Sequence, residues 1–202
     1  MTGRRTPETR LREISDAQTL RALTHPTRIA LIEALSIQGP MTATEAAEWV
    51  GESPSSCSFH LRQLEKYGFV EEAGRGAGRR RPWKVISPGL SMETVQDDPR
   101  AEIATSALIR LLHGRQMRRF ETWLESETRY SRDWRSAAIN DQNVFWMSAA
   151  ELEELGRQLR EMLLPLMRER LTDASTRPQD ALPVEVLVFG YPIGPPKDTV
   201  TR

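Results

Sequence analysis

Cysteine is nearly absent from this sequence, since Cys57 is the only one in 202 residues. A single cysteine excludes an intramolecular disulfide and every zinc site built from clustered cysteines, and it is typical of a reducing compartment. No apolar run approaches the roughly 18 residues that a membrane-spanning helix needs, and the first twenty residues lack the apolar core of a signal peptide. We therefore expect a soluble, cytoplasmic protein without membrane association.

Net charge is also missing, because 28 basic and 28 acidic residues cancel. This balance excludes a uniformly basic coat, but it leaves local patches open. Seven basic and three acidic residues lie between Pro54 and Lys84. An anionic partner should therefore bind in this stretch.

Motifs for catalysis and metal binding are absent as well. No nucleophile, base and orienting carboxylate stand at a known spacing, and the glycines at positions 74, 76 and 78 open no helix, so they form no dinucleotide fingerprint. His25, His60 and His113 are too far apart in sequence for a helical ligand pair. We expect no enzyme, no cofactor and no metal.

Apolar periodicity predicts four helices and a hairpin over residues 14–88, after a disordered tail at residues 1–13. Two short helices flank the break at His25 and Pro26. A Thr42-x-x-Glu45 capping box opens the third helix, and Ser53 caps the fourth. Strands are expected at residues 69–72 and 83–86. The fold class is therefore mainly α with a small β part, in the order of a winged helix-turn-helix.

A linker rich in proline, glycine and aspartate separates this region from the second half of the chain. Apolar spacing predicts a helix from Pro99 to about Thr128, and a second one after the Ser148-x-x-Glu151 capping box, which Pro165 should kink or end. Short β-rich runs, residues 144–147 and 184–189, flank this second helix. We expect a helical C-terminal domain at residues 97–190 with a few short strands, and a loose tail at 191–202.

The fourth helix has the pattern of a helix that reads a DNA groove. With Cys57, Leu61 and Leu64 packed inward, the remaining side chains offer small polar donors, an aromatic ring and a cation, which suit base edges in the major groove. The glycine-rich hairpin adds arginines suited to phosphates or a narrow minor groove. The expected DNA-binding residues are Ser55, Ser56, Ser58, Phe59, His60, Arg62, Arg75, Arg79, Arg80 and Arg81.

These residues resemble a known family over about 75 of the 202 residues. The stretch from Leu20 to Arg28 with its His-Pro-x-Arg, then Ser58-x-His-Leu-x-x-Leu64 with Gly68-Phe-Val, is similar to winged-helix regulators of the arsenical-resistance-repressor (ArsR) type. The resemblance implies a dimeric DNA-binding transcriptional regulator, most often a repressor, with residues 55–62 on the reading helix and residues 79–81 on the wing. The metal-sensing members carry cysteines in the helix that here spans Thr42–Val50, which has none. The resemblance therefore does not extend to metal sensing.

Several residues allow two interpretations. The helix from Pro99 should form a homodimer through Leu108, Leu111 and Leu112. The aromatic side chains Trp123, Trp134, Trp146 and Phe145 could line a pocket for an apolar small-molecule effector, although a dimer core is the better use. His60 contacts DNA or satisfies a hydrogen bond near the wing, and Cys57 is a small core residue rather than a thiol sensor.

The sequence therefore predicts a homodimeric regulator of transcription that binds double-stranded DNA. Two alternatives remain open: a winged-helix module that docks its basic wing on an acidic protein, and an enzyme or ligand carrier in the C-terminal half. The operator sequence and the sign of regulation are not encoded in any motif.

Overall fold

A computed structural model describes residues 12–14, 16–74, 81–86, 90–91, 97–172 and 174–195. The remaining positions lie outside the described residues, and they include residues 1–11 of the tail expected at residues 1–13. Arg12 and Glu13, the last two residues of that expected tail, form a short strand instead. Contacts divide the chain into two compact units, Met1–Asn140 and Asp141–Arg202. No helix in the described part is long and apolar enough to cross a membrane.

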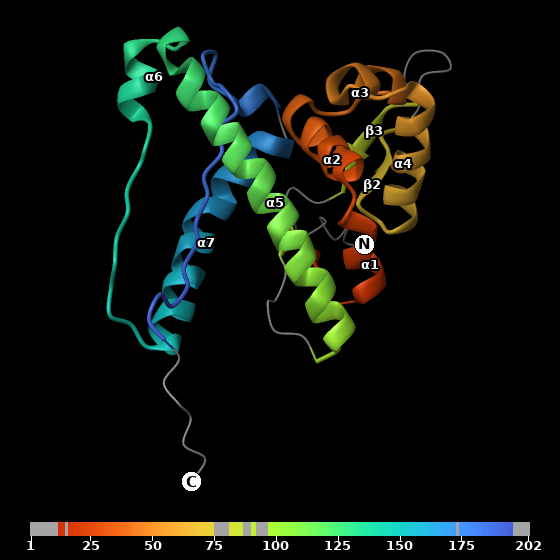
Figure 1. Cartoon of the computed structure of the whole chain (residues 1–202). Helices are drawn as coiled ribbons and strands as arrows, with labels where there is room; N and C mark the ends of the chain where they lie inside the picture. Colours follow the sequence, from red (N-terminus) through yellow and green to blue (C-terminus); the bar gives the residue numbers. More distant parts are fainter. Residues whose placement is uncertain are drawn as a thin grey trace, which may run out of the picture. The chain divides into compact units, whose positions relative to one another are not determined.

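The first unit begins with four short helices and a hairpin, which the long helix α5 and the short helix α6 follow (Figure 1). The elements are β1 (Arg12–Glu13), α1 (Ala17–Leu23), α2 (Pro26–Gln38), α3 (Ala43–Val50), α4 (Pro54–Lys66), β2 (Val70–Glu72), β3 (Trp83–Val85), β4 (Leu90–Ser91), α5 (Pro99–Ser126), η1 (Glu127–Arg129) and α6 (Arg132–Ala137). β2 and β3 are antiparallel, and β1 pairs in parallel with β4. This order confirms the predicted winged helix-turn-helix.

Helix boundaries follow the predicted caps. Thr42 accepts a hydrogen bond from the amide of Glu45, whose carboxylate accepts one from the Thr42 amide at 2.7 Å, so both halves of the capping box are made. Ser53 caps α4 by accepting from the amide of Ser56 at 3.1 Å. Pro54 occupies the first turn, where its missing amide costs nothing.

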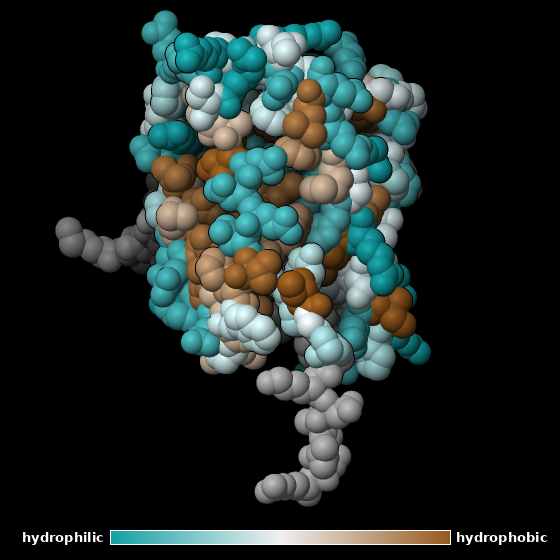
Figure 2. Space-filling view, turned by 60° about the vertical axis from the view of Figure 1, so that its left-hand side comes forward, coloured by the Kyte–Doolittle hydropathy of each residue, from teal (hydrophilic) through white to brown (hydrophobic). Residues whose placement is uncertain are grey.

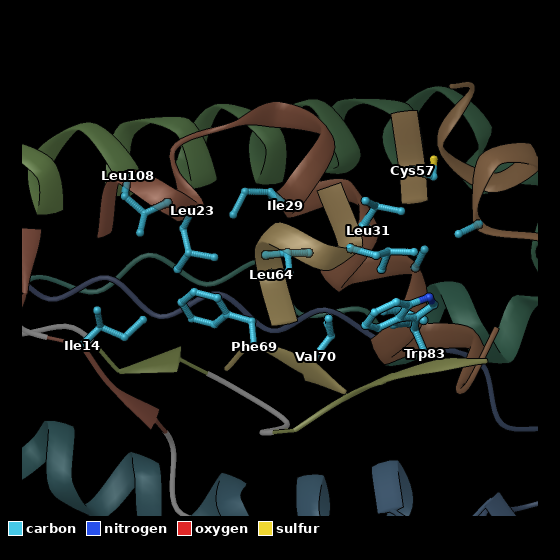
Figure 3. Packing of buried hydrophobic residues seen from close by; sticks show 14 of the residues in the cluster. Ile14, Leu23, Ile29, Leu31, Cys57, Leu64, Phe69, Val70, Trp83 and Leu108 are labelled. Carbon is cyan, nitrogen blue, oxygen red and sulfur yellow. The ribbon is translucent and has the colours of Figure 1, made fainter. Parts of the chain in front are cut away.

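The core of the first unit is a cluster of aliphatic side chains with one tryptophan (Figure 3). Leu23 and Leu31 from α1 and α2 meet Leu64 from α4, and none of the three is exposed. Trp83 of the hairpin closes one end of the cluster and Leu108 of α5 closes another (Figure 3). The hairpin and α5 are therefore parts of one packed body with the helices.

The long helix α5 shares this core, whereas we expected residues from 97 onward to begin a separate domain. Its first turns bury Ala101, Ala104 and Leu108 at 0–5% exposure. These residues recur at i, i+3 and i+7, so one apolar stripe faces α1. Periodicity alone predicts the stripe but not the surface that it covers. Because α5 packs against α1, the division between the two units falls after Asn140 instead.

The second unit contains one long helix, α7 (Ala149–Thr172), and the short η2 (Ala174–Thr176). Ser148 and Glu151 form the predicted capping box. α7 continues through Pro165 to Thr172, so the proline does not end it. Residues 144–147 and 184–189 belong to no strand of the described chain, although their composition is β-rich.

Candidate nucleic-acid interface

α3 and α4 form the helix-turn-helix. Gly51 ends α3 with φ of 72°, a left-handed conformation that glycine adopts without a steric penalty. The amides of Gly51 and Glu52 both donate to the carbonyl of Ala47, at 3.0 and 3.2 Å. This tight turn fixes the direction in which α4 leaves α3.

Several of the side chains expected to contact DNA are exposed on the outer face of α4. Ser55 and Arg62 are exposed, and Phe59 is 59% exposed although it is a large apolar residue. These residues and the exposed Lys66 are separated by four, three and four positions, so they lie on one face of the helix. Lys66 was not among the expected contacts, although this same spacing marks it.

Ser56 and Ser58 lie at the edges of this face, because both are half-buried. A shallow hollow next to α4 is lined by Ser58 and Arg62 together with Arg81 and Trp83 of the hairpin. Glu65 and Glu72 also line it, so its charges are mixed. The hollow therefore marks the corner where the reading helix meets the wing, and Arg62 and Arg81 lie on its two sides.

His60 points away from the outer face of α4. Its ring lies 4.4 Å from the ring of His25, between centroids, and Phe59 meets it edge-on at 5.2 Å. The Nδ1 atoms of both histidines are buried without a hydrogen-bond partner among the described residues. Burial, with help from His25 and Arg28, lowers the pKa of His60. The ring is therefore placed to pack α4 against the start of α2.

The stem of the wing is electrically balanced. Lys84 pairs with Glu71 at 3.0 Å, directly across the two strands, and Arg81 lies 3.8 Å from Glu72. The Arg81 side chain is still 76% exposed. The other expected wing contacts, Arg75, Arg79 and Arg80, lie outside the described residues.

The residues expected at a dimer interface pack in or against the hydrophobic core of the first unit. Leu108 is fully buried in the core, and Leu111 and Leu112 pack against that core half-buried. The apolar side chains that α5 does expose are different ones: Ile103 (72%), Met117 (41%), Phe120 (37%) and Leu124 (47%).

The candidate effector aromatics belong to two different units of the chain. In the first unit Trp123 and Trp134 are half-buried, and Trp123 stacks on Phe120 with 5.9 Å between ring centroids. In the second unit Phe145 is 64% exposed and Trp146 is fully exposed.

Cys57 is a core residue. Its side chain is not exposed, and burial raises the pKa of its thiol, with a smaller contribution from Glu52. A raised pKa disfavours the reactive thiolate. Within the described ranges, no three histidine, cysteine, aspartate or glutamate side chains gather closely enough to hold a metal ion.

Comparison with protein families identifies a domain in the first unit. Residues 23–73 match a family model described as a helix-turn-helix domain. A search of curated proteins finds no match to this chain.

Solved structures that are similar to part of this chain include two mycobacterial proteins. One is the homodimeric winged helix-turn-helix DNA-binding domain of a possible ArsR-family transcriptional regulator from Mycobacterium bovis, with 21% identity, a TM-score of 0.33, and coverage of 48% of this chain and 77% of that chain. The other is a MarR family protein of Mycobacterium tuberculosis in complex with salicylic acid, with 22% identity, a TM-score of 0.30, and coverage of 55% and 82%.

The helix-turn-helix match, the exposed outer face of α4 and the adjoining wing together indicate a DNA-binding transcriptional regulator with a winged helix-turn-helix.

Proposed function

We propose that this chain is a sequence-specific DNA-binding repressor that acts as a homodimer. The observation that carries the proposal is the outer face of α4, where Ser55, Phe59 and Arg62 are exposed while the opposite face is fully buried. A helix of this kind enters the major groove with its polar side chains toward the base edges. Repression follows when the bound dimer occupies DNA that the transcription machinery needs.

The roles of the cations differ in this proposal. Arg62 comes from the middle of the reading helix and can bind guanine through two hydrogen bonds. Arg81 comes from the wing beside it and contacts phosphate, which contributes affinity without sequence information. Lys66, at the end of α4, contacts the backbone in the same way.

The dimer is proposed to involve the exposed side of α5. Met117, Phe120 and Leu124 follow one another at i, i+3 and i+7, and Ile103 lies two heptads before Met117. The exposed apolar stripe from Met117 to Leu124 fits a second helix of the same kind, although Arg110 and His113 separate it from Ile103. Two copies would read two half-sites about one DNA turn, roughly 34 Å, apart.

The first test measures DNA affinity by fluorescence anisotropy, after selection of the preferred duplex from a random pool. Arg62→Ala should weaken the best duplex by about 1–3 kcal/mol and relax the preference at one or two positions. Arg81→Ala should weaken all duplexes alike and flatten the log–log salt dependence by about one unit. Arg135→Ala, which removes an exposed cation from α6, is the matched control and should change neither quantity.

Absence of duplex binding by the intact protein at low salt contradicts the proposal. Binding of an acidic protein under the same conditions, with no binding of DNA, would instead support the interaction-module alternative.

A further inference from the structure

Phe59 is a large apolar residue on an otherwise polar surface. It is 59% exposed, and the other exposed residues of the outer face of α4 are Ser55, Arg62 and Lys66. Because each residue of an α-helix is turned by about 100° from the one before, these four side chains fall within roughly 60° of one another. The buried stripe of α4 lies on the opposite side of the helix. Phe59 therefore belongs to the exposed face and not to the edge of the core.

Exposure alone does not identify a partner for this ring. Figure 2 shows hydrophobic side chains lying open between hydrophilic ones on one face of the molecule, and Ile103 of α5 is 72% exposed. Single apolar residues are common on protein surfaces. Phe59 differs from them in two respects, which are the restraint on its ring and the charges around it.

The ring of Phe59 is restrained from one side by a pair of histidines. It meets the ring of His60 at 74°, with 5.2 Å between centroids, and the ring of His60 in turn packs against that of His25 at 4.4 Å. The Nδ1 atoms of both histidines are buried, so this pair belongs to the body of the first unit. An edge-to-face contact of this kind is favourable and limits the rotamers of the phenyl ring. Less conformational entropy is then lost when the exposed side of the ring binds a partner.

The charges around Phe59 favour a polyanion as that partner. Arg62 and Lys66 share the outer face of α4 with it, and Arg81 of the hairpin lines the hollow next to Arg62. Glu65 also lines that hollow, but it is turned by about 120° from Phe59 around the helix. Duplex DNA combines phosphates with an apolar group in its major groove, the C5-methyl of thymine, which a phenylalanine side chain can contact.

We propose that Phe59 is a specificity-determining residue that reads the C5-methyl group of a thymine, one or two base pairs from the guanine that Arg62 binds. This inference rests on the proposed DNA-binding function and adds to it the chemical group that the ring recognises. Three residues along α4 correspond to a rise of about 4.5 Å, slightly more than the roughly 3.4 Å between base pairs. The two side chains would therefore contact neighbouring positions of the same half-site.

The first arm of the test changes the DNA and leaves the full chain unaltered. Each thymine of the selected duplex is replaced in turn by deoxyuridine, which keeps the base pair and removes only the C5-methyl group. Fluorescence anisotropy should find one thymine, within two base pairs of the guanine whose preference Arg62→Ala relaxes, at which the replacement matters. Binding should weaken there by about 3–10-fold, as expected when a buried methyl group is lost.

A variant links that methyl group to Phe59. Phe59→Ala should bind the thymine duplex about 3–10-fold more weakly than the unaltered chain does, and it should no longer distinguish thymine from deoxyuridine. Because the ring is exposed, the variant should keep the helical circular dichroism of the unaltered chain. Tyr130→Ala, the matched control, removes a 39% exposed aromatic side chain that follows η1 and should keep the full preference for thymine.

A third arm separates the methyl group from the rest of the thymine base. A cytosine paired with guanine is placed at the same position, with or without a methyl group at C5. The unaltered chain should prefer 5-methylcytosine over cytosine by about the same 3–10-fold, and Phe59→Ala should bind both duplexes equally. Methylation of a cytosine at this position is therefore expected to change the affinity of the protein for its site.

Three outcomes would overturn this inference: a preferred half-site without a thymine near the guanine, equal binding of the thymine and deoxyuridine duplexes, or a Phe59→Ala protein that keeps the preference for thymine. Equal binding of cytosine and 5-methylcytosine by the unaltered chain would also contradict it. In each of these cases the protein still binds a duplex, so the proposed DNA-binding function stands. Absence of binding to any duplex contradicts the proposed function itself, and this inference with it.

Discussion

His25 and His60 bring two imidazole rings together at the point where α2 begins and α4 passes. The centroids of the rings lie 4.4 Å apart, and the Nε atom of the half-buried Arg28 is also buried without a hydrogen-bond partner among the described residues. Burial is the main reason that the pKa of His60 lies below 6.5, and the neighbouring positive groups lower it further, whereas Glu52 opposes them. The folded protein therefore favours neutral His60.

The lowered pKa of His60 makes stability depend on pH. Below pH 6.5 the unfolded chain binds a proton that the folded chain resists, so the free energy of unfolding should fall as the pH drops from 7 through the folded pKa of His60. Above pH 7 this contribution is constant. His60→Gln should flatten the dependence between pH 7 and the folded pKa of His60, measured by urea unfolding at a series of pH values. An unchanged slope in the variant would contradict this role.

Some properties of single residues in α4 follow from the sequence, and others depend on the fold. The exposed face of α4 follows from helical spacing, and Ser55, Phe59 and Arg62 lie on it as predicted. The surroundings of the His60 side chain could not be predicted, because residue spacing along α4 does not show which side chains of α2 lie next to it. Only the fold brings His25, 35 positions earlier in the chain, to the ring of His60.

Among the elements, α5 is tied to the winged helix by charge as well as by packing. Glu33 of α2 accepts hydrogen bonds from Arg115 at 2.6 Å and pairs with Arg119 at 2.7 Å. Burial raises the pKa of Glu33, but the bonds to the two arginines outweigh this effect and hold it below its ordinary value of 4.5. The middle of α5 is thereby fixed on α2, beyond the point where its buried stripe ends.

Loss of this ion-pair network should loosen α5. Glu33→Gln is expected to lower the free energy of unfolding by about 1–2 kcal/mol at pH 7, since charge-assisted bonds of a half-buried group are stronger than surface pairs. The difference from the unaltered chain should shrink as the pH falls through the folded pKa of Glu33, where that carboxylate becomes protonated. Glu48→Gln, on the exposed side of α3, is the control. Equal losses in both variants would contradict a specific role of Glu33.

Helix ends were predictable and helix partners were not. The Thr42 and Ser148 capping boxes are local signals, and both are formed. The stripe of α5 was visible in the sequence, but Leu108 belongs to the core of the first unit rather than to an exposed surface. Local spacing reports which residues share a face, whereas the surface that buries them depends on contacts between distant segments.

At the scale of the whole molecule, a homodimer would hold two reading helices at a set separation. On a selected duplex with two half-sites, about five extra base pairs between them rotate one half-site by half a turn. Affinity should then fall toward that of a single half-site. The same insertion outside the half-sites is the control, and both are compared by anisotropy. Equal affinity for the two duplexes would mean that each winged helix binds alone.

The two units also differ in how their cores close, and this difference has a kinetic consequence. The first unit buries its cluster within one chain, so its folding is first order and independent of protein concentration. None of the side chains described in the second unit is buried, and the pairing of two copies in the proposed homodimer is a second-order step whose rate rises with the amount of chain present. A newly made copy would therefore carry a finished DNA reader before it carries a finished dimer, and the cellular abundance of the protein would itself set how many readers are coupled.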